Sequence, residues 1–432
     1  MLLEFSVKNF RSINDLQTLS FVASSLKSSP DNSFIDEKNI VNIGKNKIFK
    51  TVGIYGANGS GKSNIIKALD NFVKVVVGQP SSISNLRELC QPFLFQENSE
   101  ESESFFQFVI LINGIKYRYG ITVKVNSEKQ GLNPDKSSEI VTAEWLYSDK
   151  NGKNTLLFLR EGNQMSKIGL QSKTKIPTNL PFKHTLFLTH GSAFDTNGDC
   201  FIITDYLRRL FISNFEVNHD KFRWMSVDNI PNIDFKNRFI KLLSSFNLVY
   251  DDIFLEEDLE DFRMKDVYPQ DKIVFKKKFL STNNNFLTID LNLKKNESAG
   301  TQKLFDLAGL VLRAFNLDQP AFIILDEIDS NFHPALLIQF INLFNNEGLN
   351  RSNTQILFTS HDTNLMSPEI MRRDQFFFTE KRGNLATRLF SLADLRGVRN
   401  DADFAKQYLA GYYGAIPLLE NFCSNNNLND NE

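Results

Sequence analysis

The chain has 432 residues, of which 41% are hydrophobic and 23% charged, and its formal net charge is −2. This is an ordinary globular balance, and the length exceeds that of a typical single domain. The charge excludes a histone-like polycation, and the 3 separated cysteines favour neither a disulfide framework nor a zinc knuckle. Because the chain has no basic leader and no run of about eighteen apolar residues, we expect a cytoplasmic protein without a membrane span.

The N-terminal part has the pattern of antiparallel strands. Residues 3–8 alternate between apolar and polar side chains, which predicts a half-buried strand, and a second strand is expected around residues 19–23. Residues 24–47 are rich in Ser, Asn, Asp and Lys and are expected to form a loop. Asn113-Gly114 joins two apolar runs and therefore predicts a β-hairpin.

A second pattern, of buried strands separated by helices, surrounds these elements. Short apolar runs occupy residues 51–55, 322–325 and 355–359, and apolar residues recur at helical spacing between residues 302 and 314. Such strands form parallel sheets that are covered on both faces. We therefore expect an α/β fold with a mixed sheet, in which N-terminal antiparallel strands accompany a parallel core.

A phosphate-binding loop follows the first buried strand. Gly56 to Ser63 read G-A-N-G-S-G-K-S and match the pattern G-x-x-x-x-G-K-[ST], with a strand before and a helix after. The backbone N–H groups of such a loop surround the β-phosphate of ATP. Lys62 would bridge β- and γ-phosphate oxygens, and the Ser63 hydroxyl would bind Mg²⁺. The other nucleotide-binding candidates here are Gly56, Asn58, Gly59, Ser60, Gly61 and Asn64.

An acidic pair stands at the end of the second buried strand. Asp326 follows residues 322–325 directly and is suited to hold magnesium through water. Glu327, one residue on, is placed to polarise the attacking water. Together with the phosphate loop, this pair predicts an enzyme that hydrolyses ATP to ADP and phosphate.

The order and spacing of these motifs resemble the ABC ATPases of the SMC, RecF and OLD type. Residues 298–302, S-A-G-T-Q, resemble the ABC signature, although its common form is L-S-G-G-Q. Residues 328–331 resemble the D-loop, and His361 resembles the switch histidine. The resemblance implies that Ser298 and Gly300 cap the γ-phosphate of a partner's ATP, whereas His361 contacts the γ-phosphate of its own site.

The same resemblance implies that two copies of the chain assemble through their ATPase heads. ATP would clamp the heads together, and hydrolysis would release them. It also implies a head that is split along the chain. We expect residues 1–125 to form its first part, residues 126–290 a compact and partly helical insertion, and residues 291–432 its second part with the tail. No heptad repeat is sustained, so no long coiled coil is expected.

Two further site residues are implied by this resemblance. Arg11 lies in Asn9-Phe10-Arg11-Ser12, which resembles the N-F-R-S motif whose basic residue approaches the nucleotide. A glutamine should sense the magnesium ion, and Gln91 is the candidate, with Gln79 and Gln96 as alternatives.

The two ends of the chain narrow the resemblance. Residues 3–12 and the tail at residues 408–417, Y-L-A-G-Y-Y-G-A-I-P, resemble the stand-alone abortive-infection ATPases of the AbiL type, a group that includes the ATPase subunit of the PARIS anti-phage system. The tail carries no second acidic cluster that would suit a nuclease. The resemblance therefore implies a toxin–antitoxin-like system in which a separate effector, a nuclease or a toxin, responds to a phage trigger protein.

Two other functions are weighed against this one. The basic stretches between residues 208 and 278 would suit a RecF-like repair protein that clamps DNA in an ATP-dependent way, but the balanced charge equally fits a solvated surface. A transporter ATPase is disfavoured by the N-F-R-S start and by the split head.

Overall fold

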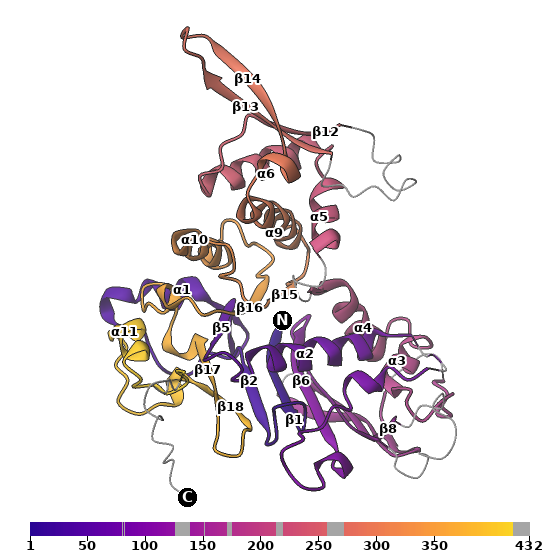
Figure 1. Cartoon of the computed structure of the whole chain (residues 1–432). Coiled ribbons are helices and arrows are strands. Elements are labelled where there is room, and N and C mark those ends of the chain that lie inside the picture. The colour runs from indigo at the N-terminus through magenta and orange to yellow at the C-terminus, as the bar shows by residue number, and fades with distance from the viewer. Residues whose placement is uncertain are drawn as a thin grey trace, which may run out of the picture.

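The structure is a computed structural model that describes residues 1–79, 81, 83–125, 139–150, 152–170, 175–212, 219–256 and 272–417. Its elements include two large sheets with helices packed around them, and a helical part carries a projecting hairpin (Figure 1). Among the described residues, no helix is long and apolar enough to cross a membrane.

The parallel core predicted from the buried strands is present as a six-stranded sheet. Its order is β11-β15-β16-β5-β17-β18, and every neighbouring pair is parallel except β17 and β18. Phe322 to Leu325 are all buried, as their unbroken apolar run predicts. The strands are β5 (Thr51–Tyr55), β11 (Phe211–Ile212), β15 (Phe322–Leu325), β16 (Gln355–Thr359), β17 (Phe376–Lys381) and β18 (Thr387–Ser391).

The antiparallel strands form a second, seven-stranded sheet in the order β10-β9-β8-β7-β6-β1-β2. The predicted hairpin is confirmed: β6 and β7 pair around Asn113-Gly114, which take positive φ angles of 50° and 76°. The strand expected around residues 19–23 ends earlier, as β2. The strands are β1 (Leu2–Lys8), β2 (Gln17–Ser20), β6 (Ser104–Ile112), β7 (Ile115–Val125), β8 (Glu139–Lys150), β9 (Lys153–Glu161) and β10 (Gln164–Ile168). The mixed α/β fold is thereby confirmed.

This sheet crosses the boundary expected at residue 125. Strands β8 to β10 belong to the stretch expected to be a compact, partly helical insertion, yet β8 pairs with β7 along its length. The helical part of that stretch follows them. Its helices are α3 (Phe187–Ser192), α4 (Asp199–Leu210), α5 (His219–Val227) and α6 (Ile233–Ser245).

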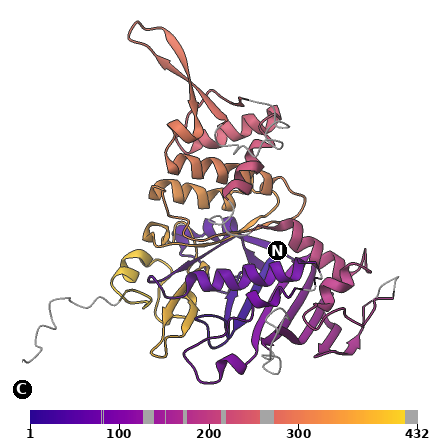
Figure 2. The same cartoon turned by 45° about the vertical axis from the view of Figure 1, so that its right-hand side comes forward.

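The helices divide between two hydrophobic cores. Helix α2 (Lys62–Val77) packs in the first core with residues of the antiparallel sheet, including Phe72 against Phe106. Helices α9 (Ala299–Phe315) and α10 (Pro334–Asn345) pack with α5 and α6 in the second core. The turned view shows this stack of helices on the opposite side of the parallel sheet from α2 (Figure 2). The remaining short helices near the C-terminal half are α8 (Leu293–Asn296) and α11 (Phe404–Leu409).

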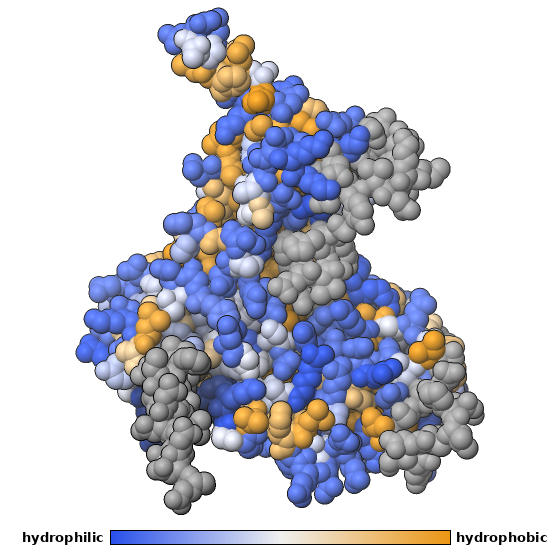
Figure 3. Space-filling model, in the orientation of Figure 1, coloured by the Kyte–Doolittle hydropathy of each residue, from blue (hydrophilic) through white to orange (hydrophobic). Residues whose placement is uncertain are grey.

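A β-hairpin projects from the top of the helical part. Strands β12 (Asp252–Leu255), β13 (Ile273–Leu280) and β14 (Phe286–Asn292) form a three-stranded sheet, and only β13 and β14 continue to the tip. Its base is buried at Phe275, whereas apolar side chains stay exposed along the outer half (Figure 3). These exposed residues are Phe279, Leu280, Phe286, Leu287 and Ile289.

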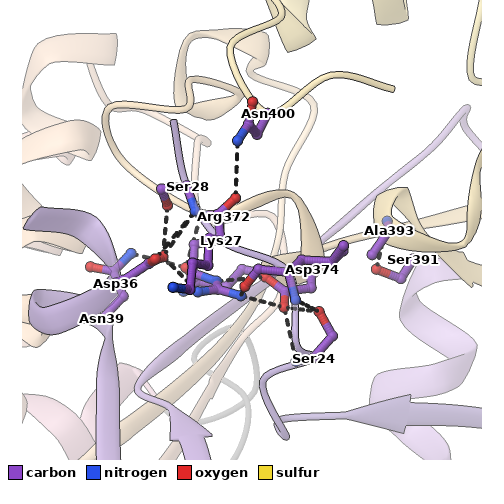
Figure 4. A network of polar contacts seen from close by, with 12 residues as sticks. Ser24, Lys27, Ser28, Asp36, Asn39, Arg372, Asp374, Ser391, Ala393 and Asn400 are labelled. Carbon is purple, nitrogen blue, oxygen red and sulfur yellow. Dashed lines mark hydrogen bonds and ion pairs between the residues drawn. The ribbon is translucent and has the colours of Figure 1, made fainter. Parts of the chain in front are cut away.

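The loop expected at residues 24–47 is wrong in part. It contains α1 (Phe34–Asn39), β3 (Ile40–Ile43) and the first half of β4 (Asn46–Phe49). The segment is held from outside by Arg372, which donates to Asp36 at 2.5 Å and to Asp374 at 2.9 Å, while the Ser24 hydroxyl donates to Asp374 at 2.6 Å (Figure 4). The regular structure of this segment is thus supported by residues more than three hundred positions away along the chain. Its local polar composition does not reveal these contacts.

Candidate nucleotide-binding site

The phosphate loop lies between the end of β5 and the start of α2, as predicted. Gly56, Gly59 and Gly61 have positive φ angles of 147°, 73° and 113°, which side chains rarely allow. A Cβ at Gly56 would lie 2.3 Å from the Thr379 carbonyl oxygen, and one at Gly61 would lie 2.1 Å from Thr387 Oγ1. Gly56 and Gly61 are therefore required both by their backbone conformation and by the close contact of β17 and β18 with the loop.

Side chains from both ends of the chain hold this loop in place. Ser60 Oγ is 2.6 Å from Thr379 Oγ1, and Thr387 donates to the Ser60 carbonyl at 2.8 Å. Ser12 Oγ lies 2.8 Å from Thr387 Oγ1 and accepts a hydrogen bond from Asn64 at 2.7 Å. The sequence does not predict the role of Thr379 and Thr387, because single threonines on strands carry no local motif.

Lys62 reaches back over the loop that it follows. Its ammonium donates to the carbonyl oxygens of Gly56 at 2.8 Å and Ala57 at 3.2 Å. Burial lowers the pKa of Lys62, and the negative charges of Asp326 and Glu327 oppose this shift. The predicted lysine and acidic pair, which are far apart in the sequence, thus lie close enough to interact electrostatically.

The acidic pair is fixed by a threonine at the end of the neighbouring strand. Thr359 donates to the Asp326 carboxylate at 2.5 Å and accepts from the backbone N–H of Glu327 at 2.7 Å. Asp326 is buried, whereas Glu327 is exposed and has a φ of 49°, in the left-handed region that is unfavourable for a non-glycine residue. Such strain is typical of functional positions.

The oxygen atoms of Ser63 and Asp326 are suited to a magnesium ion that is bound together with a nucleotide. Among the described residues, no group of three or more His, Cys, Asp or Glu side chains could hold a metal ion alone. Mg²⁺ is usually held by one or two protein oxygens together with substrate phosphates, and Ser63 and Asp326 supply a hydroxyl and a carboxylate of this kind. Held by these residues, a bound Mg²⁺ would supply positive charge against the phosphates.

His361 lies on the loop after β16, beside the same group of charges. Its backbone N–H donates to the Asp329 carboxylate at 3.2 Å. The pKa of the imidazole is lowered by burial and, to a smaller extent, by the charge of Lys62. The ring is therefore neutral at pH 7 and can offer one donor and one acceptor.

The signature-like turn is on the surface of the protomer. Ser298 is exposed and caps α9 by accepting the Thr301 N–H at 3.2 Å. Gly300 lies against the D-loop, since a Cβ there would be 2.7 Å from the Asn331 carbonyl oxygen. The start of α9 therefore packs on the loop that follows the acidic pair, while its outer edge remains accessible.

Lys303, which no motif of the sequence singles out, strengthens this packing. It is 9% exposed and donates to the Ser330 carbonyl at 2.9 Å, to Ser330 Oγ at 2.6 Å and to the Ile328 carbonyl at 3.3 Å. Its ammonium also lies 5.0 Å from the centre of the Phe332 ring. The first turns of α9 and the D-loop are thereby joined through a buried charge.

Arg11 and Gln91, which were expected to approach the nucleotide and the magnesium ion, bond to each other. Arg11 Nε donates to Gln91 Oε1 at 2.7 Å, and the Arg11 backbone N–H donates to the Gln91 carbonyl at 2.6 Å. The side-chain oxygen that would face magnesium is thus bonded to Arg11. The alternative Gln96 accepts from Asn14 at 2.6 Å, and the choice of glutamine stays a prediction.

A glycine loop between a strand and a helix, with an acidic pair at the end of a second parallel strand of the same sheet, defines a P-loop nucleotide-binding protein. The family described as "AAA domain, putative AbiEii toxin, Type IV TA system" matches residues 52–367, and the chain belongs to this family. A search among curated proteins gives no match. Among solved structures, the chain is similar to the SMC head domain from Thermotoga maritima, with 17% identity and a TM-score of 0.41 over 90% of this chain and 98% of that chain.

Proposed function

We propose that the protein binds MgATP and hydrolyses it in a sandwich between two copies of the chain. The observation that carries this proposal is the separation of two anion-binding elements. The phosphate loop opens α2 on one side of the parallel sheet, and the exposed Ser298 opens α9 on the other (Figure 1). A helix N-terminus at the surface is suited to the phosphates of a neighbouring molecule's nucleotide.

Each site residue then has a defined task. Lys62 and the loop amides bind the phosphates, and Ser63 and Asp326 hold magnesium. Glu327 is exposed beside them and would accept a proton from the attacking water. His361, being neutral, would donate a hydrogen bond to the γ-phosphate.

Substitution of Glu327 by Gln tests this assignment. The amide keeps the size of the side chain but removes the base, so the variant should bind ATP, stop turnover and accumulate as an ATP-bound dimer. Mass photometry with and without ATP measures the dimer, and phosphate release measures turnover. Lys62→Ala should lose binding altogether, and the exposed Glu369→Gln provides the matched control. Undiminished steady-state turnover in Glu327→Gln would overturn the catalytic role.

We further propose that the assembled heads regulate a separate effector, a nuclease or a toxin, in defence against phage. The toxin–antitoxin wording of the family description supports this role, and so does the resemblance of both chain ends to stand-alone abortive-infection ATPases. Co-purification with the product of a neighbouring gene, with and without ATP and a phage trigger, tests it. Salt-sensitive, ATP-dependent binding of duplex DNA in the absence of any effector would instead favour the RecF-like alternative.

A further inference from the structure

The C-terminal part of the chain contacts the phosphate loop. After α11, the chain turns so that the carbonyl oxygen of Ala415 accepts the backbone N–H of Ala57 at 2.9 Å. The same oxygen accepts the hydroxyl of Tyr408 at 3.1 Å. Ala57 is the second residue of the loop, so residues near the C-terminus hold one of its peptide groups.

The turn that presents this oxygen has an unfavourable backbone. Gly411, Gly414 and Ala415 have positive φ angles of 81°, 70° and 58°. Two of these are glycines, but Ala415 adopts the left-handed region with a side chain, which is unfavourable by itself. Surrounding contacts must therefore hold Ala415 in the conformation that points its carbonyl oxygen at the loop.

Those contacts are aromatic and connect the turn to the strands beneath the loop. Tyr408 and Tyr413 are buried and lie 5.4 and 5.8 Å from the ring of Phe378. Phe378 on β17 is in register with Tyr55, the last residue of β5 before the loop. Burial raises the pKa of the Tyr408 hydroxyl, which therefore remains a donor at all ordinary pH values.

We propose that residues 404–415 are a positioning element that keeps the phosphate loop in its nucleotide-binding form, and that displacing this element lowers the affinity for ATP. The inference rests on the proposed ATP-binding function. The acceptor of the Ala57 N–H lies at Ala415, so this bond fixes one peptide group of the loop through a residue that does not belong to the loop. Because such coupling is reciprocal, ATP should in turn tighten the contact of residues 404–415. A partner that engages this segment would thereby control nucleotide occupancy.

The substitution Tyr408→Phe tests the proposal with little change in packing. It removes the hydroxyl that orients the Ala415 carbonyl and keeps the ring against Phe378. Loss of one hydrogen bond corresponds to a weakening of ATP binding by about fivefold. Tyr412→Phe is the matched control, since Tyr412 is 78% exposed. Ala415→Val, which strains the left-handed position directly, should reproduce the weakening without touching Tyr408.

Hydrogen exchange supplies a readout that ordinary destabilisation would not produce. In the nucleotide-free protein, Tyr408→Phe should speed the exchange of the Ala57 amide selectively, and ATP should slow exchange across residues 404–415 in the wild type. Wild-type affinity and wild-type exchange at Ala57 in both variants would overturn the proposal. If the wild type itself fails to bind ATP, the proposed function fails, but exchange at Ala57 still decides whether the segment holds the loop.

Discussion

Replacement of Lys303 by Met should weaken the contact between α9 and residues 328–331 without opening a large cavity. Methionine is similar in length and apolar, so it can fill the space among Ile328, Ser330 and Phe332 but cannot donate hydrogen bonds. The carbonyl oxygens of Ile328 and Ser330 would lose this donor. The first consequence is a loss of stability, and the second is a freer Glu327, whose carbonyl oxygen is 3.5 Å from the same ammonium.

The contacts set the size of the effect. A hydrogen bond to a charged group contributes about 1.5–3 kcal/mol. By that measure the two short bonds to Ser330 contribute about 3–6 kcal/mol, but Met also removes the cost of burying an ammonium, which makes the net loss smaller. We therefore expect the free energy of unfolding to fall by about 2–3 kcal/mol, with Lys303→Arg recovering part of it.

Equilibrium unfolding in urea measures this change, provided that the slope against denaturant is the same in both proteins. Lys295→Met, at an exposed position on α8, is the control and should stay within about 0.5 kcal/mol of the wild type. A loss below about 0.5 kcal/mol in Lys303→Met would refute the reasoning, since the buried charge would then contribute nothing to holding the D-loop.

Three other outcomes are expected. Gly309→Ala should lower the free energy of unfolding by about 1–3 kcal/mol despite the better helix propensity of alanine, because the new Cβ would lie 1.8 Å from Ser226 Oγ and 2.9 Å from Ser226 Cα. Thermal unfolding measures this change, and a rise in Tm would contradict the expectation. Arg160→Met should cost about 3–5 kcal/mol in urea unfolding, since it leaves the buried Glu144 carboxylate without its ion pair, and a near-neutral result would show that the pair is dispensable. The pKa of His361 is lowered below its ordinary 6.5, so the unfolded chain takes up the proton first as the pH falls, and the free energy of unfolding decreases below about pH 6.5. The decrease between about pH 6.5 and about pH 5.5 should be smaller in His361→Asn. Equal decreases in the two proteins would show that His361 does not cause the pH dependence.

The phosphate loop and the acidic pair could be predicted from the sequence because their chemistry is contiguous. Eight neighbouring residues form the loop. The spacing of apolar residues predicts the strand before the loop and the helix after it. The pair Asp326-Glu327 follows its strand directly, so that the end of a buried run is enough to place it. The parallel core and the antiparallel hairpin were predicted for the same reason, since each strand is defined within a few residues.

The supports of the site were decided only by the tertiary structure. Thr359, Thr379 and Thr387 contact the site from separate strands, and nothing in their local sequence distinguishes them from other strand threonines. The pairing of Arg11 with Gln91 likewise joins segments that are apart along the chain.

The sequence likewise does not predict the regular structure within residues 24–47 or the contact of Ala415 with the phosphate loop, because both depend on residues that are distant along the chain. A short motif specifies which groups meet the phosphate, because neighbouring residues are close in any fold. Which distant groups hold that motif in place depends on the packing of the whole chain, and this becomes visible only when the chain has folded.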